Sequence, residues 1–377
     1  MTRRAPHEGT IRRRGDGRWE SAVHLGYRDG KRIRKSFYGK TRREVQQKLV
    51  VALRDLQRGV APTDDRRTTG QLLDRWLEDV AKATVRPRTF VSYSQTVRLH
   101  LKPTLGRAPL SKLSPQQVQA LLNSKLASGL SPRSVGIIHA VLRRALNQAV
   151  KWDLVPRNVA TLVQPPRAPR AEITPLTPDQ ARVFLDAVRG DRLEALYSVG
   201  LALGLRQGEV LGLDWTDVDL EAGTLRVAHA LQRVNGRLEL VEPKSRSSRR
   251  TIPMPATVAR ALRVHRSRQL EERLAAGPRW RESDLVFTTS MGTPLDSRNV
   301  TRRFQAALER AGLPRLRFHD LRHTAASLML AQGIAPRVVM ETLGHSQISL
   351  TMNTYSHVVP ALQREAADRM EAVLSSR

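Results

Sequence analysis

The stretch His319-Asp-Leu-Arg322-His323-Thr-Ala-Ala-Ser-Leu-Met-Leu330 joins a basic, polar start to a run of apolar residues. Its pattern predicts a helix over residues 319–332. His319 and Arg322 are three positions apart, so such a helix carries both side chains on one face. A guanidinium group binds phosphate oxygens with paired hydrogen bonds, and an imidazole exchanges protons near neutral pH. The stretch therefore indicates phosphate chemistry at the start of a helix.

Two segments elsewhere in the chain carry residues suited to the same site. Arg206 lies in Gly204-Leu-Arg-Gln-Gly-Glu209, where glycines allow a tight turn into a helix whose backbone amides favour anions. Lys244 lies in Glu242-Pro-Lys-Ser-Arg, a basic loop after a predicted strand, from which it could protonate a leaving oxygen. A non-specific phosphate contact is the other interpretation of Lys244, because arginines surround it at 246, 249 and 250.

The order of the candidate residues points to a known family. Downstream of the helix, His345 follows Leu343-Gly, and Tyr355 lies ten residues later. The full series in chain order is Arg206, Lys244, His319, Arg322, His345 and Tyr355. This order resembles the active site of the tyrosine recombinases, the phage integrase family.

The resemblance assigns a role to each of these residues. Tyr355 would attack a scissile phosphate, giving a 3′-phosphotyrosyl link and a free 5′-hydroxyl, and His319 would handle the tyrosine proton. Arg206, Arg322 and His345 would hold the phosphate, and Lys244 would protonate the leaving oxygen. Glu209 would orient the phosphate-binding residues without contacting DNA itself. The family's chemistry needs no ATP, metal or other cofactor.

A zinc site is a rival interpretation of the same helix. His319 and His323 have a spacing that places two ligands on one helix face, with His345 or His357 as a third. The zinc peptidase motif has Glu at its second position, where this chain has Asp320. We therefore expect His323 and His357 to be structural or supporting residues, and no metal.

Composition favours a nucleic-acid partner. The chain has 377 residues, which suggests two or three domains, and a formal net charge of +29. That charge, carried mostly by arginine, implies a polyanion. There is no cysteine, no apolar run long enough for a membrane span and no signal-peptide pattern. We expect a protein of the bacterial cytoplasm that associates with the nucleoid and not with membranes.

Residues 1–67 predict a small basic domain, with 19 Lys and Arg against 8 Asp and Glu. Strands are expected at Thr10–Arg14, Arg18–Tyr27 and Arg32–Tyr38, followed by a helix from a Thr41 cap to about Arg58. The pattern resembles the arm-type DNA-binding domain of integrases; a solvated basic appendage is the alternative. The candidate DNA contacts are Arg12, Arg13, Arg14, Arg18, Arg32, Arg34 and Lys35.

Residues 68–163 predict a helical bundle, and residues 164–175 a proline-rich connector. Helices are expected after a Thr69 cap, from Pro87 to Leu101, after Ser114-Pro115 and after Ser131-Pro132. The bundle resembles the core-binding domain of integrases. The connector is either a plain linker or a basic strap that lets two domains close around a duplex.

Residues 176–377 predict a mixed, mainly helical catalytic domain. Three strands of one small sheet are expected, at Leu225–Ala230, Arg237–Val241 and Arg249–Ile252. Helices are expected at 178–188, 192–204, 207–213, 255–275, 297–311, 319–332, 336–343, 349–354 and 361–375. The whole chain is thus expected to be multidomain and mainly α, with a three-stranded sheet plus helix, a helical bundle and a mixed α/β tyrosine-recombinase domain.

The resemblance implies a site-specific DNA recombinase that integrates or excises a mobile element. Its partners would be double-stranded DNA at core and arm attachment sites, three further copies in a homotetramer acting through a Holliday junction, a DNA-bending accessory protein and a directionality factor. A type IB topoisomerase and a DNA-binding protein without catalysis are the alternatives. The last helix has an apolar stripe that would pack on a neighbouring subunit or on its own domain: Leu362, Ala366, Met370 and Val373.

Overall fold

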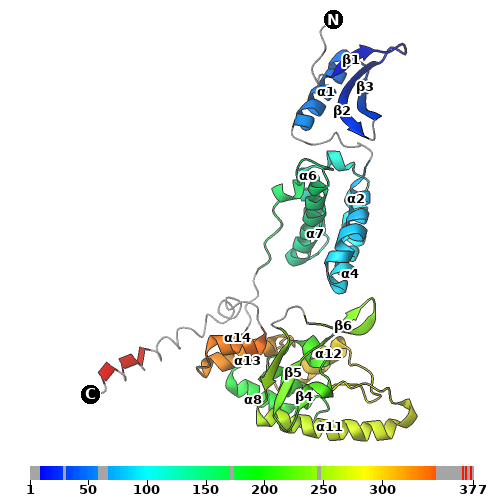
Figure 1. Cartoon of the computed structure of the whole chain (residues 1–377). Helices are drawn as coiled ribbons and strands as arrows, with labels where there is room; N and C mark the ends of the chain where they lie inside the picture. The colour runs from blue at the N-terminus through cyan, green and yellow to red at the C-terminus, as the bar shows by residue number, and fades with distance from the viewer. Residues whose placement is uncertain are drawn as a thin grey trace. The chain divides into compact units, whose positions relative to one another are not determined.

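The chain divides into two compact units, Met1–Arg170 and Ala171–Arg377 (Figure 1). The computed structural model describes residues 9–28, 31–57, 67–169, 174–243 and 248–344, and six positions between 367 and 375. The division between the units falls inside the expected connector 164–175. The finer boundaries after residues 67, 163 and 175 stay predictions. No helix within these described ranges has the length and apolar character to cross a membrane.

The first part of unit one is a sheet covered by one helix. Strands β1 (Thr10–Arg13), β2 (Trp19–Arg28) and β3 (Lys31–Gly39) are antiparallel in that order, and α1 (Arg42–Gln57) follows. Val23 packs with Leu49 and Ala52 in a small core, and the Ser21 hydroxyl donates to the Val45 carbonyl at 2.8 Å. Alternation along the strands leaves the opposite face of the sheet free of α1. The predicted strands and helix are confirmed to within one or two residues at each end.

The second part of unit one is a helical bundle with its own core. Its helices are α2 (Thr69–Trp76), α3 (Lys82–Thr84), α4 (Pro87–Thr96), α5 (Lys102–Leu105), α6 (Pro115–Ala127) and α7 (Pro132–Lys151). Ser114 and Ser131 cap α6 and α7, as their Ser-Pro pairs predict. The expected Thr69 cap is wrong. The Thr68 side chain accepts from the backbone N–H of Gln71, and Thr69 is the buried first residue of α2. π-Helical turns at Leu77–Ala81 and Val97–Leu101 join α2 to α3 and α4 to α5.

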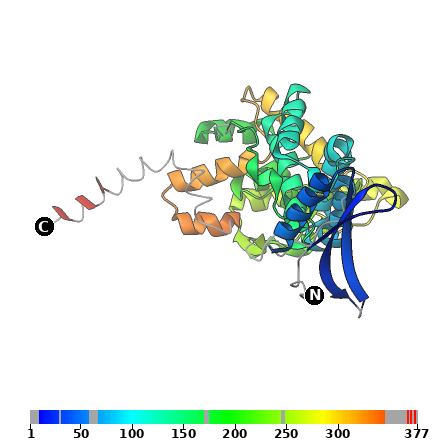
Figure 2. The same ribbon diagram turned by 90° about the horizontal axis from the view of Figure 1, so that it is seen from above.

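In the described part of unit two, helices surround two small sheets. The helices are α8 (Pro178–Ala187), α9 (Glu194–Ala202), α10 (Gln207–Leu211), α11 (Ala256–Ala276), α12 (Ser297–Arg310), α13 (Asp320–Ala331) and α14 (Pro336–Leu343). Helices α13 and α14 pack against each other and are drawn in orange in Figure 2. An aromatic cluster of Phe184, Tyr197, Phe304 and Phe318 fills the centre of the core.

The expected single sheet of unit two is wrong. Strands β4 (Val218–Asp219), β5 (Thr224–Val227) and β8 (Arg250–Pro253) form one sheet, whereas β6 (Ala230–Val234) and β7 (Arg237–Val241) form a separate hairpin. The reason is Asn235-Gly236, two residues with positive φ that make a tight turn between β6 and β7. Strand β7 therefore pairs with the segment just before it, and β5 pairs with β8.

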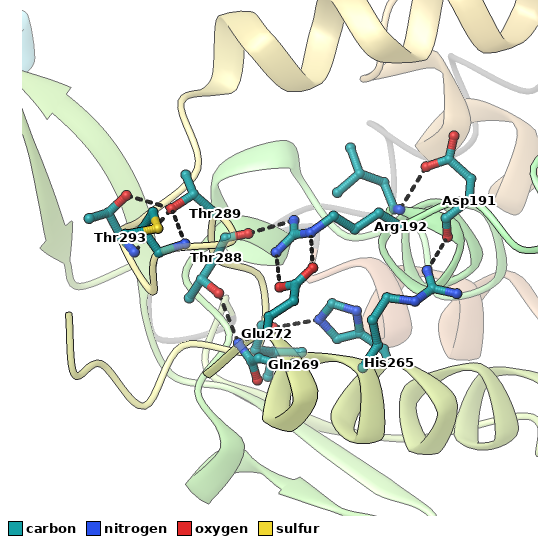
Figure 3. Close-up of polar contacts among 12 residues, drawn as sticks. Asp191, Arg192, His265, Gln269, Glu272, Thr288, Thr289 and Thr293 are labelled. Atoms are coloured by element: carbon teal, nitrogen blue, oxygen red, sulfur yellow. Dashed lines mark hydrogen bonds and ion pairs between the residues drawn. The ribbon is translucent and has the colours of Figure 1, made fainter. Parts of the chain in front are cut away.

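Polar contacts attach the long helix α11 to the rest of unit two (Figure 3). The Arg192 guanidinium bonds both Glu272 oxygens, at 2.5 and 2.6 Å, and the Thr288 carbonyl at 2.8 Å. Gln269, one turn earlier on α11, donates to the Thr288 hydroxyl, and His265, two turns earlier, bonds the Val286 carbonyl. These contacts hold α11 against the start of α9 and the segment 285–289, and so stabilise the body that carries the site.

Candidate active site

Arg206 is held at the start of α10 by one carboxylate. Glu209 accepts the Arg206 backbone N–H at 3.1 Å and its Nη1 at 2.6 Å. Burial alone would raise the pKa of Glu209, but the charges of Arg250 and Arg206 hold that pKa below its usual range. Glu209 is thus a buried anion, and Arg206 beside it keeps 39% of its side chain exposed. Arg206 is thus held in one orientation by Glu209 and remains accessible to a ligand.

Arg322 is fixed to the loop that leads into Arg206. Its side chain is buried on α13, and Nη1 donates to the Gly204 carbonyl at 2.9 Å. Gly204 has φ +61, and a Cβ there would lie 2.5 Å from Leu343 Cδ2 and 3.1 Å from Ala325 Cβ. Only glycine fits this turn, because any side chain would meet both α13 and α14. The turn therefore aligns two arginines that are 116 positions apart in the chain.

The end of α14 meets the same site. Arg206 Nη2 donates to the Gly344 carbonyl at 3.3 Å. Gly344 caps α14 in a left-handed conformation and directly precedes His345 in the sequence. The structure thus brings the start of α10, the first turn of α13 and the end of α14 together.

His319 is the N-cap residue of α13, and its imidazole is neutral at physiological pH. Desolvation first, then the neighbouring His323 and Arg322, lower the pKa of His319 to about 4, although part of its surface reaches solvent. The Arg206 charge also acts on it, so both arginines and this imidazole share one electrostatic neighbourhood. Its ring lies edge-on to His323, with centroids 5.2 Å apart. A neutral imidazole at physiological pH can accept a proton.

Three of the six expected catalytic residues are in the described part of unit two: Arg206, His319 and Arg322. Lys244, His345, Tyr355 and the alternative zinc ligand His357 lie outside the described residues. The ends of the Lys244 loop are joined by an ion pair of 2.6 Å between Arg249 and Glu242. Among the described residues there is no group of three metal-binding side chains.

Sequence reasoning missed Arg250, which it treated as one of several basic neighbours of Lys244. The structure turns this side chain inward, where Nη2 lies 3.2 Å from Glu209 Oε2. Alternation along β8 could have suggested that Arg249 and Arg250 face opposite ways, but not which of them faces inward.

The basic residues expected on the N-terminal sheet do not form one surface. Arg12, Arg14 and Arg34 gather around the buried Glu20 on the face away from α1, while Arg18 pairs with Asp16 in the turn. By the alternation of the strands, Arg13 and Lys35 lie on the face of the sheet that α1 covers. The side chain of Arg32 lies outside the described residues. Their contact with DNA stays a prediction.

Comparison with known proteins decides the family. Residues 175–361 match the phage integrase family, and residues 68–126 match the phage integrase N-terminal SAM-like domain. A tyrosine recombinase XerC-like protein of Caldanaerobacter subterraneus is 34% identical over 361 residues, covering 91% of this chain and 92% of that protein. The chain is a tyrosine recombinase of the phage integrase family.

Other proteins named integrases are similar to most of the chain. An integrase of Streptomyces ambofaciens is 33% identical and covers 94% of this chain and 96% of its own length. The Tn1549 transposon integrase, solved with a circular intermediate DNA, matches the fold with a TM-score of 0.67 over 80% of this chain and 99% of that one, at 24% identity. The expected family, enzyme class and mainly helical fold are confirmed. The individual site residues are not tested by these likenesses.

Proposed function

We propose that this tyrosine recombinase cleaves and rejoins DNA at specific sites with Tyr355 as its nucleophile, and so integrates or excises a mobile element. The observation that carries the proposal is the meeting of Arg206 and Arg322 beside the neutral His319. Among relatives of known structure, the Tn1549 integrase is bound to circular intermediate DNA and a lambda integrase tetramer to a Holliday junction. Those complexes support DNA as the substrate.

The reaction uses each of the proposed residues once. The Tyr355 oxygen attacks phosphorus while His319 takes its proton, and the bond from phosphorus to the 5′-oxygen breaks. Arg206, Arg322 and His345 bind the non-bridging oxygens, where charge accumulates, and Lys244 gives a proton to the leaving oxygen. Each such preorganised donor contributes roughly 2.7–4 kcal/mol in comparable oxyanion sites. The phosphotyrosine conserves the bond energy, so the 5′-hydroxyl of a second duplex can reverse the step.

Four copies of the chain would act on two duplexes in this scheme. The helical bundle and catalytic unit would hold core sites, and the N-terminal sheet would hold arm sites through Arg12, Arg14 and Arg34. A DNA-bending protein and a directionality factor would complete the assembly, in the cytoplasm of a bacterial host. The net charge of +29 supports a large contact with phosphates.

The test is covalent capture on nicked duplexes tiled across the junctions of the mobile element that encodes the chain. A nick beside the cleavage site lets the short strand diffuse away, so the phosphotyrosyl adduct accumulates. We expect an adduct at Tyr355 that Tyr355→Phe abolishes. Tyr197→Phe is the matched control, because Tyr197 is buried in the aromatic cluster and burial raises its pKa.

An adduct that persists in Tyr355→Phe, or none on any tiled duplex, would contradict the proposal. A further pair of assays separates recombination from topoisomerase activity. Wild-type protein should join two distinct site-bearing duplexes into recombinant products. Relaxation of a supercoiled plasmid without exchange would instead identify a topoisomerase.

A further inference from the structure

Arg250 is a buried cation next to the catalytic clamp. It begins β8, and only 8% of its side chain is exposed. Each of its three guanidinium nitrogens donates: Nη2 to Glu209 Oε2 at 3.2 Å, Nε to the Thr342 carbonyl at 2.6 Å and Nη1 to the Ser248 carbonyl at 2.9 Å. A side chain with every donor nitrogen used inside the protein is held in one orientation. Arg250 is therefore not available for contact with DNA.

Arg250 changes the charge of the group to which Arg206 belongs. Glu209 and Arg206 alone would sum to zero, and the phosphate would meet a neutral ion pair. With Arg250 the three groups sum to +1, and the exposed member of the three is Arg206. Coulomb interactions are strong where burial excludes water, so this difference acts directly on a phosphate bound at Arg206.

Arg250 also limits how Glu209 can hold Arg206. Glu209 Oε1 accepts Arg206 Nη1, whereas Oε2 is occupied by the Arg206 backbone N–H and by Arg250. Arg206 Nη2 makes a longer bond of 3.3 Å to the Gly344 carbonyl, which a phosphate oxygen can replace. Without Arg250, Oε2 could accept a second bond from the Arg206 guanidinium and turn it inward.

We propose that Arg250 is a positioning residue of the recombination reaction: it balances the charge of Glu209 from the protein side, and so keeps Arg206 positive and directed toward the scissile phosphate. The inference rests on the proposed function. It adds a residue that touches neither DNA nor the nucleophile to the set that determines the cleavage rate.

A second ion pair in the same sheet provides a matched control. Arg226 lies on β5, next to β8, and pairs with the buried Asp217 at 2.6 Å. Its side chain is 63% exposed and belongs to no part of the proposed site. Arg226→Gln therefore removes an arginine from a buried carboxylate without changing the Arg206 group.

The test compares four variants on the nicked duplex at which the wild type forms its adduct. Arg250→Gln leaves Glu209 and Arg206 as a neutral pair. In the double variant Arg250→Gln with Glu209→Gln, Arg206 regains a net charge of +1, since both partners are neutral amides. Glu209→Gln alone and Arg226→Gln complete the set. For each variant we would measure single-turnover adduct formation at saturating DNA, the DNA dissociation constant and the unfolding temperature.

We expect Arg250→Gln to lower the adduct rate roughly 100-fold, the loss typical of one oxyanion donor, with DNA affinity changed less than about threefold. The double variant should form the adduct at least about tenfold faster than Arg250→Gln, because the net charge of the group returns to +1. Arg226→Gln should cleave at the wild-type rate. A double variant no faster than Arg250→Gln, or equal losses in Arg250→Gln and Arg226→Gln, would overturn the inference while leaving the proposed function intact.

Failure of the proposed function would look different. Wild-type protein would then form no adduct at Tyr355 on any duplex, and the role of Arg250 would be rejected with it. If Arg250→Gln fails to fold, the double variant still decides, because it does not bury the Glu209 carboxylate without its Arg250 partner. A folded double variant that cleaves more than about tenfold more slowly than the wild type, which carries the same net charge of +1, would contradict the inference.

Discussion

Two buried glutamates, one in each unit, each share their carboxylate among arginines, and they create different surfaces. Glu20 lies on the N-terminal sheet with Arg12, Arg14 and Arg34 around it. Glu209 lies at the start of α10 between Arg206 and Arg250. Both residues are only 3% exposed. The carboxylate alone therefore does not distinguish the basic face of the N-terminal sheet from the proposed catalytic site.

The difference lies in what else holds the arginines. The partners of Glu20 are largely exposed, with 62% of the Arg12 side chain reaching solvent. Around Glu209, Arg206 and Arg250 also bond backbone carbonyls of Gly344 and Thr342, at the end of α14. Exposed long side chains lose much of an ion pair's energy to water and to their own mobility. We infer that Glu209 and these carbonyls together fix the orientation of Arg206 and Arg250, whereas the more exposed arginines around Glu20 supply mainly charge.

The same substitution of one arginine beside each carboxylate should test the comparison most strongly. Arg206→Gln removes an oriented phosphate donor, and we expect adduct formation at saturating DNA to fall roughly 10²–10³-fold. Arg34→Gln should leave that rate unchanged, because it removes charge from a surface without orienting function. The measurement is single-turnover capture on the nicked duplex. Similar losses in both variants would show that the two groups do not differ in kind.

Two glycines with positive φ, Gly204 and Gly17, test whether the backbone at the site is tightly packed. Gly204→Ala forces a side chain into a positive-φ turn and onto Leu343, so we expect a loss of about 2–4 kcal/mol in unfolding free energy. Gly17 also has positive φ, but a Cβ there meets nothing within 4 Å. Gly17→Ala should cost only about 1 kcal/mol. Denaturant unfolding of the full chain measures both, and equal losses would argue against tight packing at Gly204.

The basic residues around Glu20 should affect the affinity for DNA and not the rate of cleavage. Arg12→Gln with Arg34→Gln should weaken binding to arm-site DNA roughly three- to tenfold per lost phosphate contact. The slope of log affinity against log salt should become shallower by about one per contact. Fluorescence anisotropy over a salt series measures both quantities. An unchanged slope would remove this face from the DNA interface.

The smallest expected effect is a difference in acid sensitivity. Burial lowers the pKa of His265 below its ordinary 6.5, so the unfolded chain binds a proton that the folded chain does not as the pH falls. Unit two should thus lose stability from about pH 6.5 downward. Hydrogen bonds from Arg12 and Ser36 hold the pKa of Glu20 below 4.5, so its stabilising contribution lasts until the pH falls below that value.

Hydrogen exchange of the full chain, resolved by peptide and corrected for intrinsic rates, would follow both regions. Protection around α11 should fall at higher pH than protection around β2. His265→Gln keeps a donor toward the Val286 carbonyl without a titrating ring, and it should reduce the pH dependence around α11. The same pH response in this variant would exclude His265 as the cause.

Local chemistry made much of the fold predictable. Ser114 and Ser131 identify the starts of α6 and α7, because a cap followed by proline acts within a few residues. The sequence order also identifies Arg206, His319 and Arg322, which the structure brings into one neighbourhood. Arg250 could not be found in this way, because its inward orientation depends on the register of Val227 with Arg250 and on the position of α14. Such contacts arise only from packing between distant segments.

The contacts at the end of α14 determine which residues near the site can differ in sequence between relatives. Arg250 and Arg206 bond the carbonyls of Thr342 and Gly344, which belong to the backbone and remain whatever side chain stands there. Replacement of the Thr342 side chain during divergence would leave the Arg250 contact in place. Glu209 offers no such tolerance, because its contribution lies wholly in its carboxylate. Drift among relatives should therefore be common at position 342 and rare at position 209.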